Sequence, residues 1–331
     1  SRALLIGCGA LGCVIADSLV RAGIGHLTIV DRDVVEVTNL QRQVLFSESD
    51  AAEGLPKAEA ALKRLMAVNS LVRIDAVVAD FAAGNAERIL RAGGPFPAVL
   101  LDGTDNFETR YLINDLAVKH GIPYVYGGAV GTRGMAMTIL PREGPCLRCM
   151  FDEPPAAGTM PTCDTAGVLG PVIAMVAARQ AAEAIKLLVG QTEAVARTLF
   201  EIDAWSNLRR EVDLGAGARR ADCACCGQGK FEYLSGSRAG TTLALCGQDA
   251  IQVSPPGNGE RLDLAALAAR IDQHGDFRAV GSCLIRGELR NESGSNGTKI
   301  GLTVFADGRA IVKGTTRPEV ARAIYSKYVG M

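Results

Sequence analysis

The N-terminal stretch contains the feature that most constrains the fold of this chain. The apolar run ALLIG leads into a glycine turn, Gly7-x-Gly9-x-x-Gly12, and the run LTIVD that follows the next helical segment ends in Asp31. A strand, a glycine turn, a helix and a second strand ending in an acidic residue are typical of a nucleotide-binding βαβ unit. Gly7 permits the tight bend, and Gly9 lets the backbone approach a phosphate or ribose. The glycines alone do not identify the nucleotide.

Strand-like and helix-like runs alternate from Ala3 to about Leu140. This alternation predicts an α/β fold with a doubly wound, Rossmann-like, mostly parallel sheet whose strands are joined by crossover helices. The run TRGMAMTILP predicts a more antiparallel strand at the far side of the sheet. The apolar stretch 168–190 contains charged residues, so it predicts a buried helix and not a membrane span.

Composition and length limit the class of protein. Apolar residues make up 48% of the 331 residues and charged residues 21%, which is typical of well-packed globular proteins. The formal net charge is −1, so we expect neither a nucleic acid nor a membrane as a partner. No secretory signal precedes the first strand, and the cytoplasm is the expected location.

A Gly-rich linker near residues 227–231 predicts two domains, residues 1–227 and 231–331. The second segment combines strand patterns, one amphipathic helix, a hairpin at Asp307-Gly308 and a final helix, which predicts a small α+β domain. It contains no cluster of His, Asp or Glu of the kind a second active site needs. We expect it either to dock a partner protein or to support a dimer.

Two cysteine pairs with metal-ligand spacing lie on loop-like segments. They are Cys146-x-x-Cys149 and Cys223-x-x-Cys226. In a reducing compartment such pairs indicate a closed tetrahedral zinc site and not disulfides. The site would clamp the crossover region to the end of the first domain. Cys225 lies inside the second pair and is the alternative ligand.

Polar side chains follow the second strand, on the same sheet edge as the glycine turn. Asn39 and Arg42 lie in NLQRQ, and Lys57 begins the next helix. Two permanent cations and an amide beside a nucleotide favour a triphosphate over a nicotinamide ring.

The run LLDGTDN places further polar groups at that edge, because it closes another strand. Its carboxylates are Asp102 and Asp105, followed by Asn106. Asp105 can ligate a Mg²⁺ ion bound to the phosphates, since carboxylate oxygens suit that ion. The alternative is that Asp105 caps the following helix.

These motifs occur in a fixed order that resembles a known family. The order is the glycine turn, Asp31 with Asp33, NLQRQ, Lys57, DGTDN, CLRC, TCDTAGVLGP and CACCG. It resembles the MoeB/ThiF/HesA-type adenylyltransferases, relatives of ubiquitin-activating enzymes that activate ubiquitin-like sulfur carriers. The resemblance covers roughly residues 3–227. It implies that ATP and the C-terminal glycine of a β-grasp carrier ending in Gly-Gly form an acyl-adenylate and release pyrophosphate.

The resemblance also implies roles for individual residues. Arg42, Lys57, Asp105 and Cys163 would be catalytic, with Cys163 taking over the activated carrier. Asp105 would hold Mg²⁺. The nucleotide would contact Gly7, Gly9, Ala10, Gly12, Asp31, Asp33, Asn39, Arg42, Lys57, Asp105 and Asn106. Ala10 stands where the family usually has glycine.

Two other functions fit parts of the pattern. An NAD-dependent oxidoreductase would explain the glycine turn and Asp31, but not NLQRQ or the cysteine pairs. An inactive scaffold half of an activating complex would not need Arg42, Lys57 and Asp105 together. We therefore expect an active, zinc-containing homodimeric enzyme that uses ATP and Mg²⁺, with a downstream acceptor protein as a further partner. The sequence does not name the carrier or its pathway.

Overall fold

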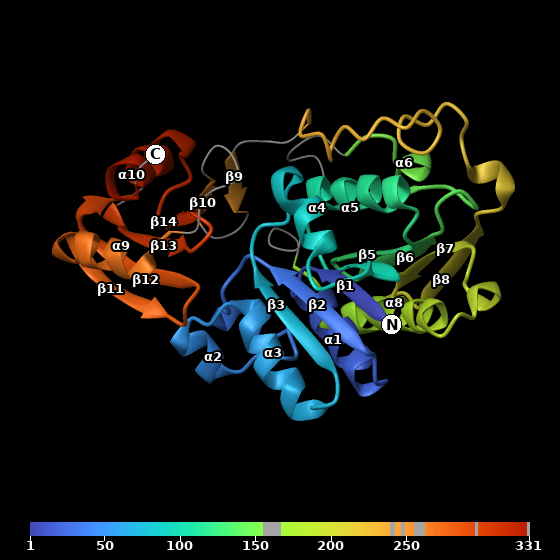
Figure 1. Cartoon of the computed structure of the whole chain (residues 1–331), viewed down its shortest axis with the longest axis horizontal. Coiled ribbons are helices and arrows are strands. Elements are labelled where there is room, and N and C mark those ends of the chain that lie inside the picture. The colour runs from blue at the N-terminus through green and yellow to red at the C-terminus, as the bar shows by residue number, and fades with distance from the viewer. Residues whose placement is uncertain (155–166, 239–241, 246–248, 255–261, 295–296, 330–331) are drawn as a thin grey trace. The chain divides into compact units, whose positions relative to one another are not determined.

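The computed structural model describes residues 1–154, 167–238, 242–245, 249–254, 262–294 and 297–329. The chain divides into two compact units, Ser1–Ala239 and Gly240–Met331 (Figure 1). Each unit has its own sheet and its own apolar core.

The first unit is built on one eight-stranded sheet, in the order β3-β2-β1-β4-β5-β6-β7-β8 (Figure 1). Its strands are β1 Arg2–Ile6, β2 His26–Asp31, β3 Arg73–Val78, β4 Val99–Asp102, β5 Tyr124–Val130, β6 Arg133–Ile139, β7 Thr198–Asp203 and β8 Leu208–Asp213. Strands β1 to β5 pair in parallel, and β5 to β8 pair antiparallel. The Rossmann-like parallel sheet and the antiparallel β6 are thus confirmed. Strands β7 and β8, which extend the antiparallel part, were not predicted from the sequence.

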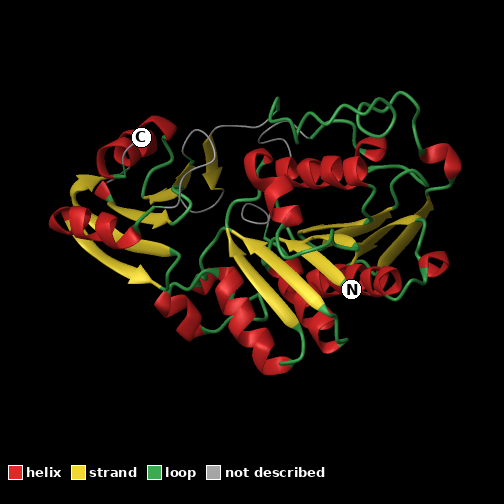
Figure 2. Cartoon of the chain, viewed as in Figure 1, coloured by secondary structure: helices red, strands yellow, loops and turns green. Residues whose placement is uncertain are grey.

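Helices lie on both sides of this sheet, as a doubly wound fold requires (Figure 2). They are α1 Ala10–Arg21, α2 Glu48–Glu53, α3 Lys57–Val68, α4 Ala83–Arg91, α5 Phe107–His120, α6 Leu147–Met150 and α8 Gly170–Leu188, with short 3-10 helices at Val37–Asn39, Thr192–Ala194 and Ala216–Ala218. One core joins α1, α3 and α8 to the face that carries Leu5, and a second joins α4 and α5 to the face that carries Leu4. Strand β1 is therefore buried on both faces, which explains its unbroken apolar run.

Helix α8 coincides with the buried helix expected between residues 168 and 190. Its acidic residue Glu183 is 3% exposed and pairs with Lys186 at 2.7 Å and Arg179 at 3.5 Å. These pairs explain how charged residues are accommodated in a buried helix. In the described parts of the chain, no helix is both long enough and apolar enough to span a membrane.

The second unit is an antiparallel sheet in the order β11-β12-β13-β14-β10-β9. Its elements are β9 Thr242–Leu245, β10 Ala250–Val253, α9 Leu264–Ile271, a 3-10 turn at Asp272–His274, β11 Gly275–Val280, β12 Leu284–Ser293, β13 Lys299–Phe305, β14 Ala310–Lys313 and α10 Pro318–Tyr328. Residues of α9 and α10 share one core with Ile285, Leu302 and Val312 of the strands. The turn at Asp307-Gly308 joins β13 to β14.

The first unit extends beyond the boundary expected near residues 227–231. Residues 230–238, here called the strap, pack against α5 and against α6, the short helix that contains Arg148. Tyr233 is 4% exposed and its ring centroid lies 5.0 Å from that of Tyr111. The Asp115 carboxylate accepts from the Tyr233 amide at 2.9 Å, and Arg148 donates to Glu232 at 2.9 Å. The unit division therefore falls after the strap.

Two truncated chains test the placement of the strap. A chain ending at Lys230 loses Tyr233 from the core and leaves Asp115 and Arg148 without these partners, whereas a chain ending at Ala239 keeps them. Loss of a buried aromatic side chain costs about 3–5 kcal/mol. We expect a melting temperature roughly 10 °C lower for the shorter chain, measured by circular dichroism. Equal melting temperatures for the two chains would contradict the assignment.

Candidate functional site

Two of the three glycines in the turn after β1 are required by the fold itself. Gly7 has φ 87°, and a Cβ on it would lie 2.7 Å from the carbonyl carbon of Gly103. A Cβ on Gly12 would lie 2.1 Å from the Gly7 carbonyl oxygen. The start of α1 and the loop after β4 thus approach each other at backbone distance.

Gly9 differs from its neighbours, because the described part of the protein leaves room for a side chain there. Its φ is −81°, and the nearest atoms to a Cβ at this position would be the Gly103 oxygen at 3.8 Å and the Gln43 Nε2 at 3.9 Å. Ala10 begins α1 directly after it. The missing side chain leaves open space at a helix N-terminus, where the phosphates of a nucleotide bind favourably.

Asp31, at the end of β2, joins the glycine turn to the next loop. Its Oδ2 accepts from the Cys8 amide at 2.6 Å, and its Oδ1 accepts from the Asp33 amide at 2.7 Å. Burial raises the pKa of Asp31, while the Lys57 ammonium and the two amides oppose that rise. Each carboxylate oxygen has a further lone pair, so the group can still accept from the hydroxyls of a ribose.

Lys57, the first residue of α3, holds a buried positive charge beside Asp31. Its side chain is 9% exposed, and its Nζ lies 3.2 Å from Asp33 Oδ2. Burial by itself would lower the pKa of Lys57, but Asp33, Asp31 and Asp105 together raise it above its usual value. The ammonium is therefore charged at neutral pH and available to a phosphate.

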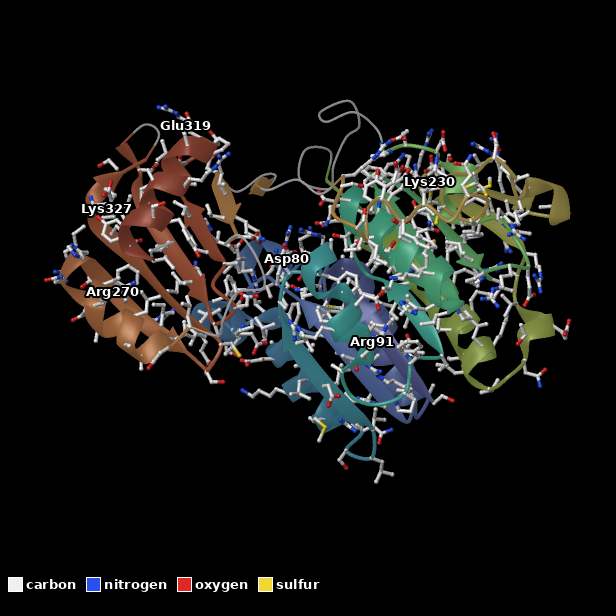
Figure 3. All side chains as sticks on the ribbon, turned by 45° about the horizontal axis from the view of Figure 1, so that its top comes forward. Asp80, Arg91, Lys230, Arg270, Glu319 and Lys327 are labelled. Atoms are coloured by element: carbon white, nitrogen blue, oxygen red, sulfur yellow. The ribbon has the colours of Figure 1, made fainter. Side chains whose placement is uncertain are left out.

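Arg32 adds a cation that the sequence analysis did not select. Its Nη1 donates to Asp80 at 3.1 Å, and its Nε lies 3.7 Å from Asp33 (Figure 3 labels Asp80). Burial opposes its charge, but Asp80, Asp33 and Asp105 hold the pKa of Arg32 above its usual value. Its position directly after Asp31 in the sequence was the available signal.

The segment NLQRQ lies just beyond β2, as expected, but its side chains also form hydrogen bonds within their own loop. Asn39 is buried, and its Oδ1 accepts from the Glu36 amide at 3.1 Å. Arg42 is partly exposed and donates to the Thr38 carbonyl at 3.0 Å. Gln43, which the sequence analysis did not select, is 4% exposed, and its Oε1 has no hydrogen-bond partner in the described part of the structure.

Asp105 does not cap α5, so the alternative role expected for it is wrong. The N-cap of α5 is Asn106, whose side chain accepts from the Thr109 amide at 2.8 Å. Asp105 is exposed, and it is among the carboxylates that raise the pKa of Lys57 and Arg32 against the effect of burial. Asp105 thus lies within electrostatic reach of both cations, and its oxygens suit Mg²⁺.

The four paired cysteines come together in the folded chain. The Sγ atoms of Cys146, Cys149, Cys223 and Cys226 all lie within 4.8 Å of one another. The separations are 4.0 Å for Cys146–Cys149, 3.7 Å for Cys146–Cys223 and 3.3 Å for Cys149–Cys226. A tetrahedral zinc with Zn–S bonds of about 2.3 Å needs sulfurs about 3.8 Å apart, so the cluster has the size of a zinc site.

The alternative ligand Cys225 lies outside this cluster of four. Its thiol is fully buried and accepts from Asn114 Nδ2 at 3.3 Å. The same Asn114 accepts from the Leu147 amide at 2.8 Å, so it links the two cysteine loops. Cys163 lies outside the described residues.

Substitutions in the glycine turn distinguish the effect of an added methyl group on folding stability from its effect on ATP binding. We expect Gly9→Ala to keep the melting temperature within about 3 °C of wild type but to weaken ATP binding roughly tenfold, because its methyl group fills the open space. Gly12→Ala, the matched control, should lower the melting temperature strongly, since its methyl group meets the Gly7 carbonyl. Calorimetric titration with ATP provides the measurement. Unchanged ATP affinity in Gly9→Ala would show that the nucleotide lies elsewhere.

Comparison with known proteins connects this site to a family. The ThiF family matches residues 1–225. The sulfur carrier protein ThiS adenylyltransferase of Bacillus subtilis is 40% identical over 330 residues, covering 100% of this chain and 93% of the relative. The sulfur carrier protein adenylyltransferase of Thermus thermophilus is 41% identical over 229 residues, covering 68% of this chain and 81% of the relative.

A solved structure shares the fold of a large part of this chain. The crystal structure of E. coli MccB with ATP superposes with a TM-score of 0.59 at 22% identity, covering 69% of this chain and 67% of that chain. At this identity the likeness concerns the fold.

Proposed function

Because this chain belongs to the ThiF family, we propose that it is an adenylyltransferase that uses ATP to activate the C-terminal glycine of a ubiquitin-like sulfur carrier. The relatives of Bacillus subtilis and Thermus thermophilus are named as adenylyltransferases of a sulfur carrier protein. The observation that carries the proposal is the buried Lys57 ammonium, which is paired with Asp33 and lies within electrostatic reach of Asp31 and Asp105. This arrangement lies at the carboxyl ends of the parallel strands, where doubly wound folds bind nucleotides.

The proposed roles follow from charge and position. Asp31 binds the ribose hydroxyls, and Asn39, Arg42 and Lys57 bind the phosphates. Asp105 holds Mg²⁺, which when bound neutralises negative charge on the phosphates. The attacking group is the carboxylate of the carrier glycine, which is already ionised at neutral pH. The protein therefore needs no general base, but it must offset charge on the α-phosphate and align the reactants.

These side chains favour ATP over the NAD of an oxidoreductase. Lys57 offers a charged ammonium where a triphosphate has its highest charge density. An inactive scaffold would not need a buried cation kept charged by three carboxylates. Both observations support an active ATP-dependent enzyme.

ATP–pyrophosphate exchange that depends on a carrier ending in Gly-Gly tests the proposal. We expect Asp105→Asn to reduce exchange by at least about 100-fold, because it removes the proposed metal carboxylate. Asp75→Asn, which removes a carboxylate from β3 that pairs with His26, is the control and should keep more than half of the activity. Exchange at the wild-type rate in Asp105→Asn would remove that residue from the mechanism.

The four-cysteine cluster is proposed to hold a structural zinc. It joins α6, which contains Cys149 and is preceded by Cys146, to the loop before the strap, so a bound metal would contribute directly to folding stability. Paired Cys-x-x-Cys motifs that gather into one cluster of metal-site size are typical of reducing compartments, and we propose a cytoplasmic location on that ground.

A matched pair of cysteine substitutions tests the zinc assignment. Cys223→Ser removes one of the four thiols, and we expect it to lose zinc and to melt well below wild type. Cys225→Ser changes a neighbouring buried thiol outside the cluster, and it should keep about one zinc per chain. Elemental analysis of protein purified without chelator gives the readout. Zinc retained by Cys223→Ser and lost by Cys225→Ser would reverse the ligand assignment.

Further parts of the proposal rest on the family resemblance. Cys163 would accept the activated carrier as a thioester, with AMP as the leaving group. The chain would act as a homodimer and pass the carrier to a downstream acceptor. The second unit, over which the match to the Bacillus subtilis relative also extends, is proposed to dock a partner or to support the dimer.

A further inference from the structure

A buried carboxylate lies directly beneath the loop that carries Asp105. Asp102, the last residue of β4, is 0% exposed. Its Oδ1 accepts from the amide of Thr104 at 2.9 Å and from the hydroxyl of Thr104 at 2.7 Å. Its Oδ2 accepts from the Tyr124 hydroxyl at 2.9 Å and lies 3.4 Å from the Nε of Arg110. Asp102 is therefore too enclosed to bind a ligand. It holds the loop through its two hydrogen bonds to Thr104.

Arg110, which lies on α5, also forms a hydrogen bond to Thr104. It is 8% exposed, and its Nη2 donates to the Thr104 carbonyl at 2.8 Å and to the Gly127 carbonyl at 3.3 Å. Its guanidinium also lies over the rings of Phe107 and Tyr126, at 5.5 Å from each centroid. The amide, carbonyl and hydroxyl of Thr104 are thus all bonded to this one ion pair.

The residues on either side of Asp105 leave its backbone little freedom. On one side, Gly103 packs so closely that a Cβ on it would lie 2.2 Å from the Gly7 oxygen, and Thr104 is held as described. On the other side, Asn106 caps α5. Between them, the Asp105 carboxylate is exposed and within electrostatic reach of Lys57.

We infer that the buried pair Asp102–Arg110 is a positioning device that fixes the Asp105 carboxylate, through Thr104, for the metal–nucleotide complex. This inference rests on the proposed function of Asp105. A buried ion pair is weak evidence for stability, because apolar residues of the same volume often stabilise as well. Its directional hydrogen bonds do fix a loop geometry, and a carboxylate that must meet a metal and a polyphosphate needs such fixing.

Two isosteric substitutions separate positioning from stability. Thr104→Val and Tyr124→Phe each remove one side-chain hydrogen bond to Asp102, but only Thr104 lies on the Asp105 loop. We expect similar decreases in melting temperature for the two variants. We also expect the Mg²⁺ concentration that half-saturates carrier-dependent exchange to rise at least fivefold in Thr104→Val and to stay within twofold in Tyr124→Phe.

A binding readout that does not depend on turnover accompanies this test. ATP with Mg²⁺ should raise the melting temperature of Tyr124→Phe as much as that of wild type, and that of Thr104→Val clearly less. AMP without metal should stabilise all three equally, because it does not engage Asp105. Equal Mg²⁺ requirements for the two variants would overturn the inference.

Asp105→Asn distinguishes failure of the inference from failure of the proposed function. If Asp105→Asn raises the Mg²⁺ requirement but Thr104→Val does not, the metal role stands and the positioning role is wrong. If neither substitution changes it, Asp105 is not the metal ligand, and the inference fails together with the proposed role of Asp105, while exchange that depends on the carrier still supports the adenylyltransferase function. Arg110→Lys, which keeps the charge but not the planar pair of donors, should behave like Thr104→Val.

Discussion

The close approach of three glycines is the constraint on which the rest of the site depends. Gly7, Gly12 and Gly103 leave no room for a Cβ on one another's backbones, so the turn that starts α1 and the loop that follows β4 are held together. Two adjacent parallel strands, β1 and β4, deliver these two segments to the same edge of the sheet. The N-terminus of α1, proposed to bind phosphates, and the loop of Asp105, proposed to hold a metal, thereby become neighbours.

The charges around this edge are balanced within the protein. Lys57 is buried against Asp33, and the Asp31 and Asp105 carboxylates add to the field that keeps it protonated. A buried charge without partners would cost several kcal/mol, so the carboxylates make the ammonium tolerable before any ligand binds. A polyphosphate with Mg²⁺ presents both signs of charge, and it can engage the ammonium and the carboxylates together.

On the side of the sheet that α4 and α5 cover, the cysteine cluster and the strap both bond to α5. Asn114 and Asp115, adjacent on α5, bond respectively to the two cysteine loops and to the strap. Because α5 also carries Arg110, one helix connects the thiol cluster with the Asp105 loop. Stability supplied by the cysteine region therefore also supports the helix that shapes the nucleotide edge.

Local sequence patterns determined the parallel half of the sheet, because apolar runs, glycine turns and capped helices are read over a few residues. Spacing also predicted Cys146, Cys149, Cys223 and Cys226 as one cluster, with Cys225 as the alternative that the folded chain places outside it. Tertiary structure decided what depends on contacts far apart in the chain. It assigned the cap of α5 to Asn106 and not Asp105, brought Arg32 beside Asp80, buried Asp102 with Arg110, and kept the strap in the first unit. These outcomes depend on which groups lie close enough in the folded chain to bond to the same partner. A pattern in the sequence does not contain that information.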